Sequence, residues 1–345
     1  MADQGEKVTF ENMHRFGRLQ DAGQEIDMNE AFYVACRSVR DFRSREAAAL
    51  ALADTVRAKL DQLSLTSPDP DRVDRANADK LVKGESVSIG PILDNGQVRD
   101  VLSYLMAKDV YPMYGEDRRP FRADRPRDGV VIGRYSLQDI ARAPHLLHML
   151  LHPRLLGAAT AFLGALPTVS ICTFVWSFAT GQEAQNMQLF HRDNDDFRQC
   201  KAFVLLTDTL DAQDGPHVYV RHSVDQDMVR RRLEGRGIAP DHREDLLHRL
   251  FDGVPNHRYA DSLVEEAFGP ESVDVLTGRA GDCFMENTWG IHKGLPPRRA
   301  PRLVLQIQYA LQPSLFFTYE PVAIPGMDRL SAEDRYVCRA YLKAR

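Results

Sequence analysis

The chain has 345 residues and nearly balanced charge, with 44 basic and 49 acidic side chains and a net charge of −5. This length permits one large domain or two ordinary ones, with a buried core. The balance excludes a strongly basic surface, so we expect neither a nucleic-acid partner nor attachment to an anionic membrane. The start of the sequence lacks the layout of a signal peptide, and no apolar stretch approaches the roughly 18 residues that cross a bilayer.

The five cysteines are scattered, odd in number and free of CxxC spacing. Such a set predicts reduced thiols rather than a disulfide framework, so we expect a cytoplasmic protein. The sequence predicts no particular oligomeric state.

The amino-terminal part of the chain is predicted to be helical. Ser44 stands where it would cap a helix over residues 45–63, whose turns are filled by alanine and leucine. Residues 64–77 are rich in proline, aspartate and serine, which is typical of a loop. We expect residues 1–84 to form a helical extension packed on the core of the protein.

The following segment mixes a strand, helices and a loop. A strand is predicted over residues 87–93, an amphipathic helix over residues 97–108 and a polar loop over residues 115–134. Ser136 followed by Asp139 is the pattern of a capping box, which predicts a short helix that runs through residue 141.

Three histidines lie near two prolines that each suit the first position of a helix, Pro144 and Pro153. His145, His148 and His152 would share one helix face, a geometry that a zinc site can use. No carboxylate or cysteine accompanies them, so we interpret them as ordinary polar residues.

From residue 167 onward the apolar pattern changes to a period of two, which is typical of strands. Many short strands after a helical start favour a mainly β fold, a sandwich or barrel with flanking helices. The charged segment 223–272 interrupts these strands with helical stretches, and we interpret it as a lid or binding insertion. The predicted strands cover residues 172–178, 187–193, 201–206, 218–220, 273–276, 282–286 and 302–311.

His191 and Asp193 form an HxD pair on a predicted strand. Side chains two apart on a strand share a face, with Cα atoms about 7 Å apart, so an imidazole and a carboxylate point the same way. A third candidate ligand, His292, lies just beyond the predicted strand 282–286. Two histidines and one carboxylate are the facial set that holds non-haem iron(II), with open positions for a bidentate co-substrate and dioxygen.

Four motifs follow one another along the chain: His191-Arg192-Asp193, then Gly215-Pro216 leading into residues 218–220, then Ala280-Gly281-Asp282, then His292 followed ten positions later by Arg302. Together they resemble the iron(II)- and 2-oxoglutarate-dependent dioxygenases of the phytanoyl-CoA dioxygenase type. The resemblance covers roughly residues 85–320. It implies a double-stranded β-helix core (jelly-roll, cupin-like) over that range, which would contain the lid insertion, and we expect a helical tail over residues 321–345.

The resemblance further implies an oxygenase that uses Fe(II), 2-oxoglutarate as co-substrate and O2. It would hydroxylate, or otherwise oxidise, an unactivated C–H bond of a small organic substrate, while 2-oxoglutarate loses CO2 and becomes succinate. His191, Asp193 and His292 match the iron ligands of the family. Arg302 matches the arginine that holds the distal carboxylate of 2-oxoglutarate, a role that suits a bidentate guanidinium.

More than one residue of the chain could bind the distal carboxylate of 2-oxoglutarate. Arg298 and Arg299 compete with it, but they lie in a proline-bracketed loop, whereas Arg302 opens a strand that fixes its direction. The residue two after the distal histidine is often serine in the family and helps to bind the carboxylate; here it is Gly294. Another hydroxyl would have to take that role, and the candidates are Thr173, Ser177 and Thr288.

Other polar residues near the motifs receive no role. His217 and His222 are close enough in sequence to reach the site, but we interpret them as ordinary polar residues that flank it, because the sequence does not fix the strand register there. The family commonly continues after Gly-Pro towards Pro-Gly-Ser-His, whereas this chain differs over residues 221–224, so no substrate contact is transferred from that turn. Arg192 lies between two ligands, and strand alternation turns it away from them.

The HRD triplet has other interpretations, which the sequence opposes. A kinase catalytic loop needs an asparagine five positions after the aspartate, where this chain has Arg198. A calcium loop is opposed by Phe197 at a ligand position and by the missing glycine. A related group of halogenases replaces the carboxylate with a small residue, whereas Asp193 is present here.

Two rival functions remain open. One is a non-catalytic jelly-roll binding protein, against which the intact triad counts. The other is a metal-dependent jelly-roll enzyme that does not use 2-oxoglutarate, and Arg302 is the residue that separates it from the first interpretation. The sequence does not identify the substrate, but we expect its cavity to be lined by the insertion 223–272 and by the amino-terminal helices.

Overall fold

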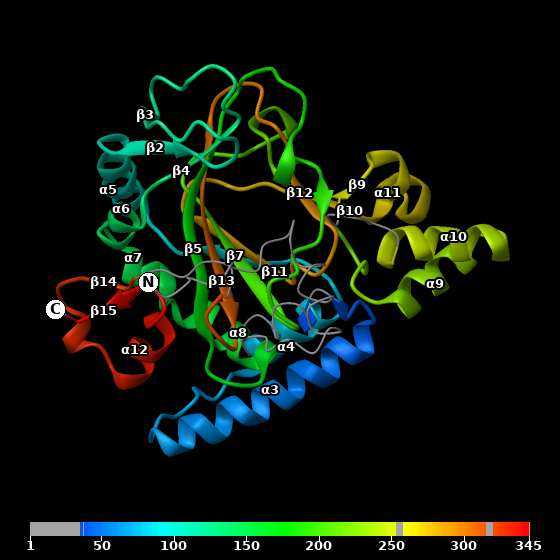
Figure 1. Ribbon diagram of the computed structural model, residues 1–345, viewed down its shortest axis with the longest axis horizontal. Helices are drawn as coiled ribbons and strands as arrows, with labels where there is room; N and C mark the ends of the chain where they lie inside the picture. The colour runs from blue at the N-terminus through cyan, green and yellow to red at the C-terminus, as the bar shows by residue number, and fades with distance from the viewer. Residues whose placement is uncertain (1–34, 37, 253–257, 315–319, 345) are drawn as a thin grey trace, which may run out of the picture.

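Two antiparallel β-sheets face each other in the computed structural model, which describes residues 35–36, 38–252, 258–314 and 320–344. The large sheet has the strand order β1-β11-β7-β13-β5-β4-β2-β3, and the small sheet has the order β10-β8-β12-β6-β9. Between β5 and β13 the chain passes repeatedly from one sheet to the other, which is the topology of a double-stranded β-helix. Helices flank the two sheets (Figure 1). The predicted fold class is therefore confirmed.

The strands of the large sheet are β1 (Val87–Pro91), β2 (Asp109–Pro112), β3 (Phe121–Arg122), β4 (Ile132–Arg134), β5 (Thr168–Ser177), β7 (Gln199–Leu205), β11 (Asp282–Glu286) and β13 (Arg302–Ala310). Those of the small sheet are β6 (Phe190–His191), β8 (His217–Val220), β9 (Arg258–Tyr259), β10 (Val273–Leu276) and β12 (His292–Gly294). Both β3 and β4 fall inside residues 115–134, so the prediction of a continuous loop there is wrong. These short strands carry few apolar residues and are held by pairing with β2 and β5.

The large sheet has two chemically different faces, as the period of two predicts. On β13, Leu303, Leu305 and Ile307 join the main hydrophobic core under the helices. The alternate residues, which include Arg302 and Val304, face the small sheet. Because β7, β5 and β11 alternate in the same way, the space between the two sheets receives most of the polar and charged side chains of the large sheet.

Two amino-terminal helices, α3 (Phe42–Gln62) and α4 (Arg72–Val82), lie near α8 (Pro153–Leu163) on the outer side of the large sheet. The predicted helix 45–63 is confirmed as α3, but its cap is Asp41, whose carboxylate accepts a hydrogen bond from the backbone N–H of Ser44. The start of α4 lies inside residues 64–77, which were expected to form a loop. Asp71 and Asp74 form a capping box there, because aspartate favours helix starts as well as turns.

Three further helices are α5 (Asn95–Met106), α6 (Leu137–Ala141) and α7 (Leu146–Leu150). The capping box of Ser136 is confirmed, since its hydroxyl accepts from the backbone N–H of Asp139. The helix predicted to start at Pro144 begins later, because His145 adopts a left-handed backbone with φ of 58°.

An 18-residue window, Leu146–Leu163, has a mean hydropathy of 1.3, which is long and apolar enough to cross a membrane. The expectation that no stretch approaches this length is therefore wrong. The window is not one continuous helix, because α7 ends at Leu150 and α8 begins at Pro153. Since 61% of the window is buried inside the protein, it has the character of a core segment.

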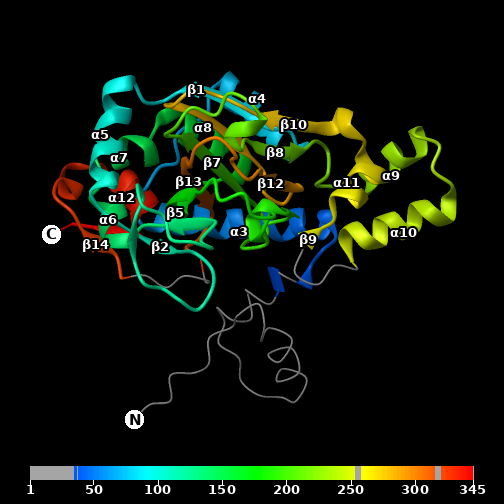
Figure 2. The same ribbon diagram turned by 90° about the horizontal axis from the view of Figure 1, so that it is seen from above.

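The insertion after β8 contains α9 (Gln226–Gly235), α10 (Pro240–Phe251) and α11 (Asp261–Phe268), which stand beside the small sheet in Figures 1 and 2. The predicted helices of this segment are confirmed. Leu250, Tyr259 and Phe268 form a separate hydrophobic core with Phe190 and Val220 of the small sheet. The strand β9 between α10 and α11 pairs with β6, so the insertion also completes the edge of the small sheet.

The carboxy-terminal residues 320–344 include the helix α12 (Ala332–Cys338) and a parallel pair formed by β14 (Val322–Ala323) and β15 (Leu342–Lys343). All five cysteines lie in the described part of the chain, where each is buried and unpaired. The division into an extension over residues 1–84, a core over 85–320 and a tail over 321–345 stays a prediction.

Candidate metal centre

The structure brings His191, Asp193 and His292 together between the two sheets. One ligand atom from each lies within 4.8 Å of the others, and no other such cluster occurs among the described residues. The Nε2 atom of His191 is 3.7 Å from Oδ1 of Asp193, and the Nε2 atom of His292 is 3.6 Å from Oδ2. The two histidines are direct partners across β6 and β12. Asp193 lies beyond β6, which ends at His191, so its predicted place on the strand is wrong.

Backbone contacts fix the direction of all three side chains. The Nδ1 atom of His191 is 2.8 Å from the carbonyl oxygen of Leu189, and that of His292 is 2.9 Å from the carbonyl oxygen of Gly290. In the tautomer in which Nδ1–H donates to these carbonyls, the Nε2 lone pair points at the partner ligands. The backbone N–H of Asp193 donates to the carbonyl of Thr288, so the loop after β6 is tied to the loop before β12.

Lys201 was given no role from the sequence, although it touches the centre. Its Nζ atom is 2.5 Å from Oδ2 of Asp193, and both side chains are mostly buried. Burial by itself raises the pKa of Asp193, but the charge of Lys201 and the nearby His292 together hold it well below its ordinary value. Burial and the nearby His292 lower the pKa of His191. The site therefore holds a charged carboxylate beside a neutral imidazole, which are the forms that ligate metals.

A second buried pair supports His292 from behind. The Nε2 atom of His217 is 2.9 Å from Oε1 of Glu286. The ring of His217 is stacked on the ring of His292, with 5.5 Å between the ring centroids. Glu286 is completely buried. Burial lowers the pKa of His292, yet the charges of Glu286 and Asp193 reverse this and leave the pKa raised. The expectation that His217 merely flanks the site is wrong, whereas His222 lies outside it and contacts the carbonyl of Lys83.

Arg302 opens β13 and faces the same space. Its guanidinium donates to the carbonyl of Gly215 and, over 3.2 Å, to the hydroxyl of Ser177, its cross-strand partner. No acidic residue in the described part of the chain pairs with it, and its Nε atom is buried without a partner. Burial lowers the pKa of Arg302 to about 10. A largely buried cation with no acidic partner fits a site for a carboxylate ligand.

Gly294 explains how the guanidinium of Arg302 is accommodated. A Cβ atom added at Gly294 would lie 2.9 Å from Nη2 of Arg302, so a serine at this position would displace the guanidinium. Ser177 instead presents a hydroxyl beside it. Of the three predicted hydroxyl candidates, Ser177 contacts Arg302, Thr288 accepts from the side-chain amide of Gln199, and Thr173 faces another cavity.

The three candidate ligands and Arg302 line one small cavity of about 60 Å³ between the sheets, which we call the inner cavity. The rest of its wall combines apolar side chains such as Phe203, Phe284 and Val304 with polar ones, which include Ser177 and His217. The inner cavity therefore links the cluster of metal-ligand side chains to a guanidinium that has no acidic partner among the described residues.

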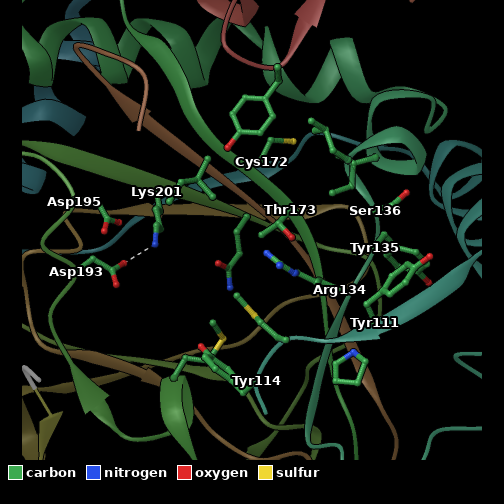
Figure 3. Close-up of a pocket in the computed structure, with 18 of the residues that line it drawn as sticks. Tyr111, Tyr114, Arg134, Tyr135, Ser136, Cys172, Thr173, Asp193, Asp195 and Lys201 are labelled. Carbon is green, nitrogen blue, oxygen red and sulfur yellow. Dashed lines mark hydrogen bonds and ion pairs between the residues drawn. The ribbon is translucent and has the colours of Figure 1, made fainter. Parts of the chain in front are cut away.

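A larger cavity of about 660 Å³ adjoins the inner cavity, and we call it the outer cavity (Figure 3). Both cavities share Met187, Asp193, Lys201 and Gln306 in their walls. Most of the outer wall comes from β2 and the segment after it, from β4 and residues 135–140 that follow it, and from β5. Among the described residues, the insertion contributes only Arg258 to this wall and the amino-terminal helices contribute nothing. The expected origin of the substrate cavity stays a prediction.

Other candidates from the sequence lie apart from the centre. Arg299 forms ion pairs with Asp211 and Asp214 on the surface. Arg192 turns away from the ligands, as expected, and donates to the carbonyl of Trp289 at 2.5 Å and to the hydroxyl of Tyr259 at 2.9 Å. It therefore joins the loop before β12 to the insertion.

The three histidines near α7 form no metal cluster within the described residues. His145 pairs with Asp100, and His148 contacts the carbonyl of Ile92. Their interpretation as ordinary polar residues agrees with these contacts.

No protein-family model matches the chain, and no curated protein matches its sequence. Among solved structures, the non-heme α-ketoglutarate-dependent epimerase SnoN from nogalamycin biosynthesis is 17% identical over 69% of this chain and 82% of its own, with a TM-score of 0.46. The carbocyclase SnoK from the same biosynthesis is 18% identical, over 74% and 90% of the two chains, with a TM-score of 0.44. HygX from Streptomyces hygroscopicus, solved with nickel and 2-oxoglutarate, is 18% identical, over 80% and 97%, with a TM-score of 0.44.

These identities and TM-scores describe distant likenesses, so the function has to be inferred from the residues of this chain. The resemblance to the phytanoyl-CoA dioxygenase type accordingly stays a prediction.

Proposed function

We propose that this protein is an iron(II)- and 2-oxoglutarate-dependent oxygenase that hydroxylates a small organic substrate. One observation carries the proposal: a cluster of two imidazoles and one carboxylate shares an enclosed cavity with a guanidinium that has no acidic partner among the described residues.

The donor set fits the metal and the co-substrate. Two histidine nitrogens and one carboxylate oxygen suit non-haem iron(II), and a facial set leaves positions for other ligands. Arg302, with Ser177 beside it, offers the donors that a carboxylate needs. When bound, iron(II) and 2-oxoglutarate supply the activation of dioxygen and the oxidation of a C–H bond.

The chain's own residues bind and orient. Lys201 donates to Oδ2 of Asp193, so it restricts the rotation of that carboxylate and its second oxygen. The Glu286–His217 pair packs behind His292. The charge of Glu286 offsets the effect of burial on the pKa of His292. The apolar part of the inner wall, Phe203, Leu205, Phe284 and Val304, limits the access of water, which strengthens the attraction between Arg302 and a bound carboxylate.

The two rival functions fit the site less well. A binding protein without catalysis has no use for three converging metal-ligand side chains. A metal enzyme without 2-oxoglutarate has no use for a guanidinium that faces the same cavity without an acidic partner among the described residues. Asp193 is present and faces both histidines, which favours hydroxylation over halogenation.

An anaerobic titration tests the proposal. Iron(II) and 2-oxoglutarate added together to the purified protein should produce a weak visible charge-transfer band, and Asp193→Ala should lose it. Arg299→Gln is the matched control, because Arg299 forms surface ion pairs, and it should keep the band. If the wild-type protein binds iron yet shows no band, the 2-oxoglutarate proposal is wrong. If the band appears, the release of succinate under air, measured with each member of a panel of small molecules, identifies the substrate.

A further inference from the structure

An arginine in the wall of the outer cavity has no assigned role. Arg134 is the last residue of β4, where it pairs with Tyr111 of β2 and Val175 of β5. Pairing on both sides fixes the backbone from which its side chain projects. Figure 3 shows the guanidinium of Arg134 pointing into the cavity near Thr173, on the side that leads towards Asp193 and Lys201.

The side chain of Arg134 is half-buried and forms no hydrogen bond or ion pair with any described residue. Two other cations of the outer cavity differ in this respect. Lys201 is held by Asp193, and Arg118 donates to the carbonyls of Pro112 and Met113. A half-buried guanidinium loses part of its hydration, so the geometry leaves its donors available for a ligand.

The charges that line the outer cavity favour an anion. Four cationic side chains face two carboxylates, Asp193 and Asp195, and Lys201 neutralises the first of these. Arg258, on the strand that pairs with β6, also has no acidic partner in the described part of the chain. An amine in this cavity would meet an excess of like charge, whereas an oxyanion would be attracted. The cationic residues are Arg118, Arg134, Lys201 and Arg258.

The rest of the wall is suited to an apolar body. Tyr111, Met113, Leu137, Ile140 and Ile171 surround the space. A cavity of about 660 Å³ lies in the range that holds ligands of drug-like size. The expected ligand is therefore an amphipathic molecule with one anionic group.

We propose that the substrate carries an oxyanion, a carboxylate or a phosphate, which Arg134 binds in the outer cavity. The apolar part of the substrate lies against the aromatic and aliphatic wall, and the bound oxyanion sets how far it reaches towards Asp193. The reaction performed on this substrate rests on the proposed function, but the binding step does not. Arg134 lines only the outer cavity and Arg302 only the inner one, so the two guanidinium groups serve different anions.

Binding of three matched probes tests the proposal: 3-phenylpropionate, its primary amide and 3-phenylpropylphosphonate. Ligand-observed NMR measures each affinity for the full chain loaded with Zn(II) and saturated with 2-oxoglutarate, which occupies the inner cavity. We expect an anionic probe to bind about 10-fold to 100-fold more tightly than the amide. The stronger of carboxylate and phosphonate identifies the preferred oxyanion.

Three variants assign that preference. Arg134→Gln should bind all three probes equally, whereas Arg134→Lys should keep part of the preference because it keeps the charge. Arg142→Gln should behave as wild type, since Arg142 donates to Gln138 and does not line the cavity. Thermal unfolding of each variant verifies that it is folded.

The proposal is overturned if wild-type protein binds the amide as well as the anions, or if Arg134→Gln keeps the preference. It is also overturned if the preference appears only without 2-oxoglutarate, because the probes then occupy the site of Arg302. Arg134→Gln should retain the charge-transfer band with iron(II) and 2-oxoglutarate, and its loss would assign Arg134 to the co-substrate. If wild type shows the preference without any such band, the proposed function fails while the anion site stands.

Discussion

Replacing Arg302 with glutamine removes a guanidinium that has no acidic partner in the described part of the chain. Burial lowers its pKa from 12.5 to about 10, so the side chain is still charged at neutral pH but is held in an unfavourable place. Because one pKa unit corresponds to ~1.4 kcal/mol, the unliganded protein bears a cost of about 3 kcal/mol for this charge. A bound carboxylate would offset that cost.

The variant should therefore change two measurements in different ways. Loss of a charge-assisted, bidentate contact weakens 2-oxoglutarate binding by about 1.5–3 kcal/mol, which is roughly 10-fold to 150-fold in Kd. The free energy of unfolding of the unliganded protein should change by less than about 1 kcal/mol, because the lost hydrogen bonds to Gly215 and Ser177 are offset by removal of the buried charge.

The assay is anaerobic titration of the Fe(II)-loaded protein with 2-oxoglutarate, followed through the visible band, together with urea unfolding of the metal-free protein. Arg302→Lys keeps the charge but not the two parallel donors, so its affinity should be intermediate. Arg299→Gln should match wild type, because its partners are Asp211 and Asp214 on the surface. Normal 2-oxoglutarate affinity combined with a large loss of stability would refute the reasoning, since Arg302 would then be a structural residue.

Two other substitutions have defined outcomes. Gly294→Ala places a Cβ atom 2.9 Å from Nη2 of Arg302, so the affinity for 2-oxoglutarate should fall about tenfold. Iron binding, measured by equilibrium dialysis, should be unchanged, and an equal loss of both affinities would contradict this prediction. Burial raises the pKa of Asp196 from 3.8 to about 7, so the folded state retains a proton that the unfolded state releases. Its contribution to stability is complete below about pH 4 and is lost as the pH rises through about 7. Asp196→Asn should therefore gain stability relative to wild type as the pH rises from 5 to 8, measured by thermal unfolding of the metal-free protein. If the unfolding temperatures of variant and wild type change with pH in parallel, this carboxyl group has no such role.

The period-two pattern of the sequence predicted the framework of the site well. On β13 it separated the core-facing Leu303 and Leu305 from Arg302, and it placed His191 on a strand. His292 was expected just beyond a strand but begins β12, which is the neighbour of β6. Asp193 was identified correctly as a member of the cluster but not as a loop residue. The spacing of an HxD motif is compatible with either, and the tie to Thr288 that bends the chain is visible only in three dimensions.

The supporting charges could not be predicted in the same way. Lys201 reaches Asp193 from β7 of the large sheet, and Glu286 reaches His217 from β11. The first pair joins a strand of the large sheet to the loop after β6, and the second joins strands of opposite sheets. The sequence contains no signal for how the two sheets are registered against each other. The alternation on β7 does place Lys201 on the face opposite to Ala202, so a search for charged residues on inward faces would have found it.

The pairing of β6 with β9 also bears on how such a protein can acquire new substrates. The strand that carries His191 has two residues, and on one side its neighbour is a two-residue strand from the insertion, with His191 opposite Arg258. Exchange of the insertion for one from a relative would therefore replace part of the support of a metal-ligand strand together with one wall residue of the outer cavity. In an engineering programme, libraries that vary the insertion should hold residues 258–259 constant, because otherwise selection for a new specificity would also select against metal affinity. The walls formed by β2, β4 and the segment after β2 carry no metal ligand and offer the freer place for variation.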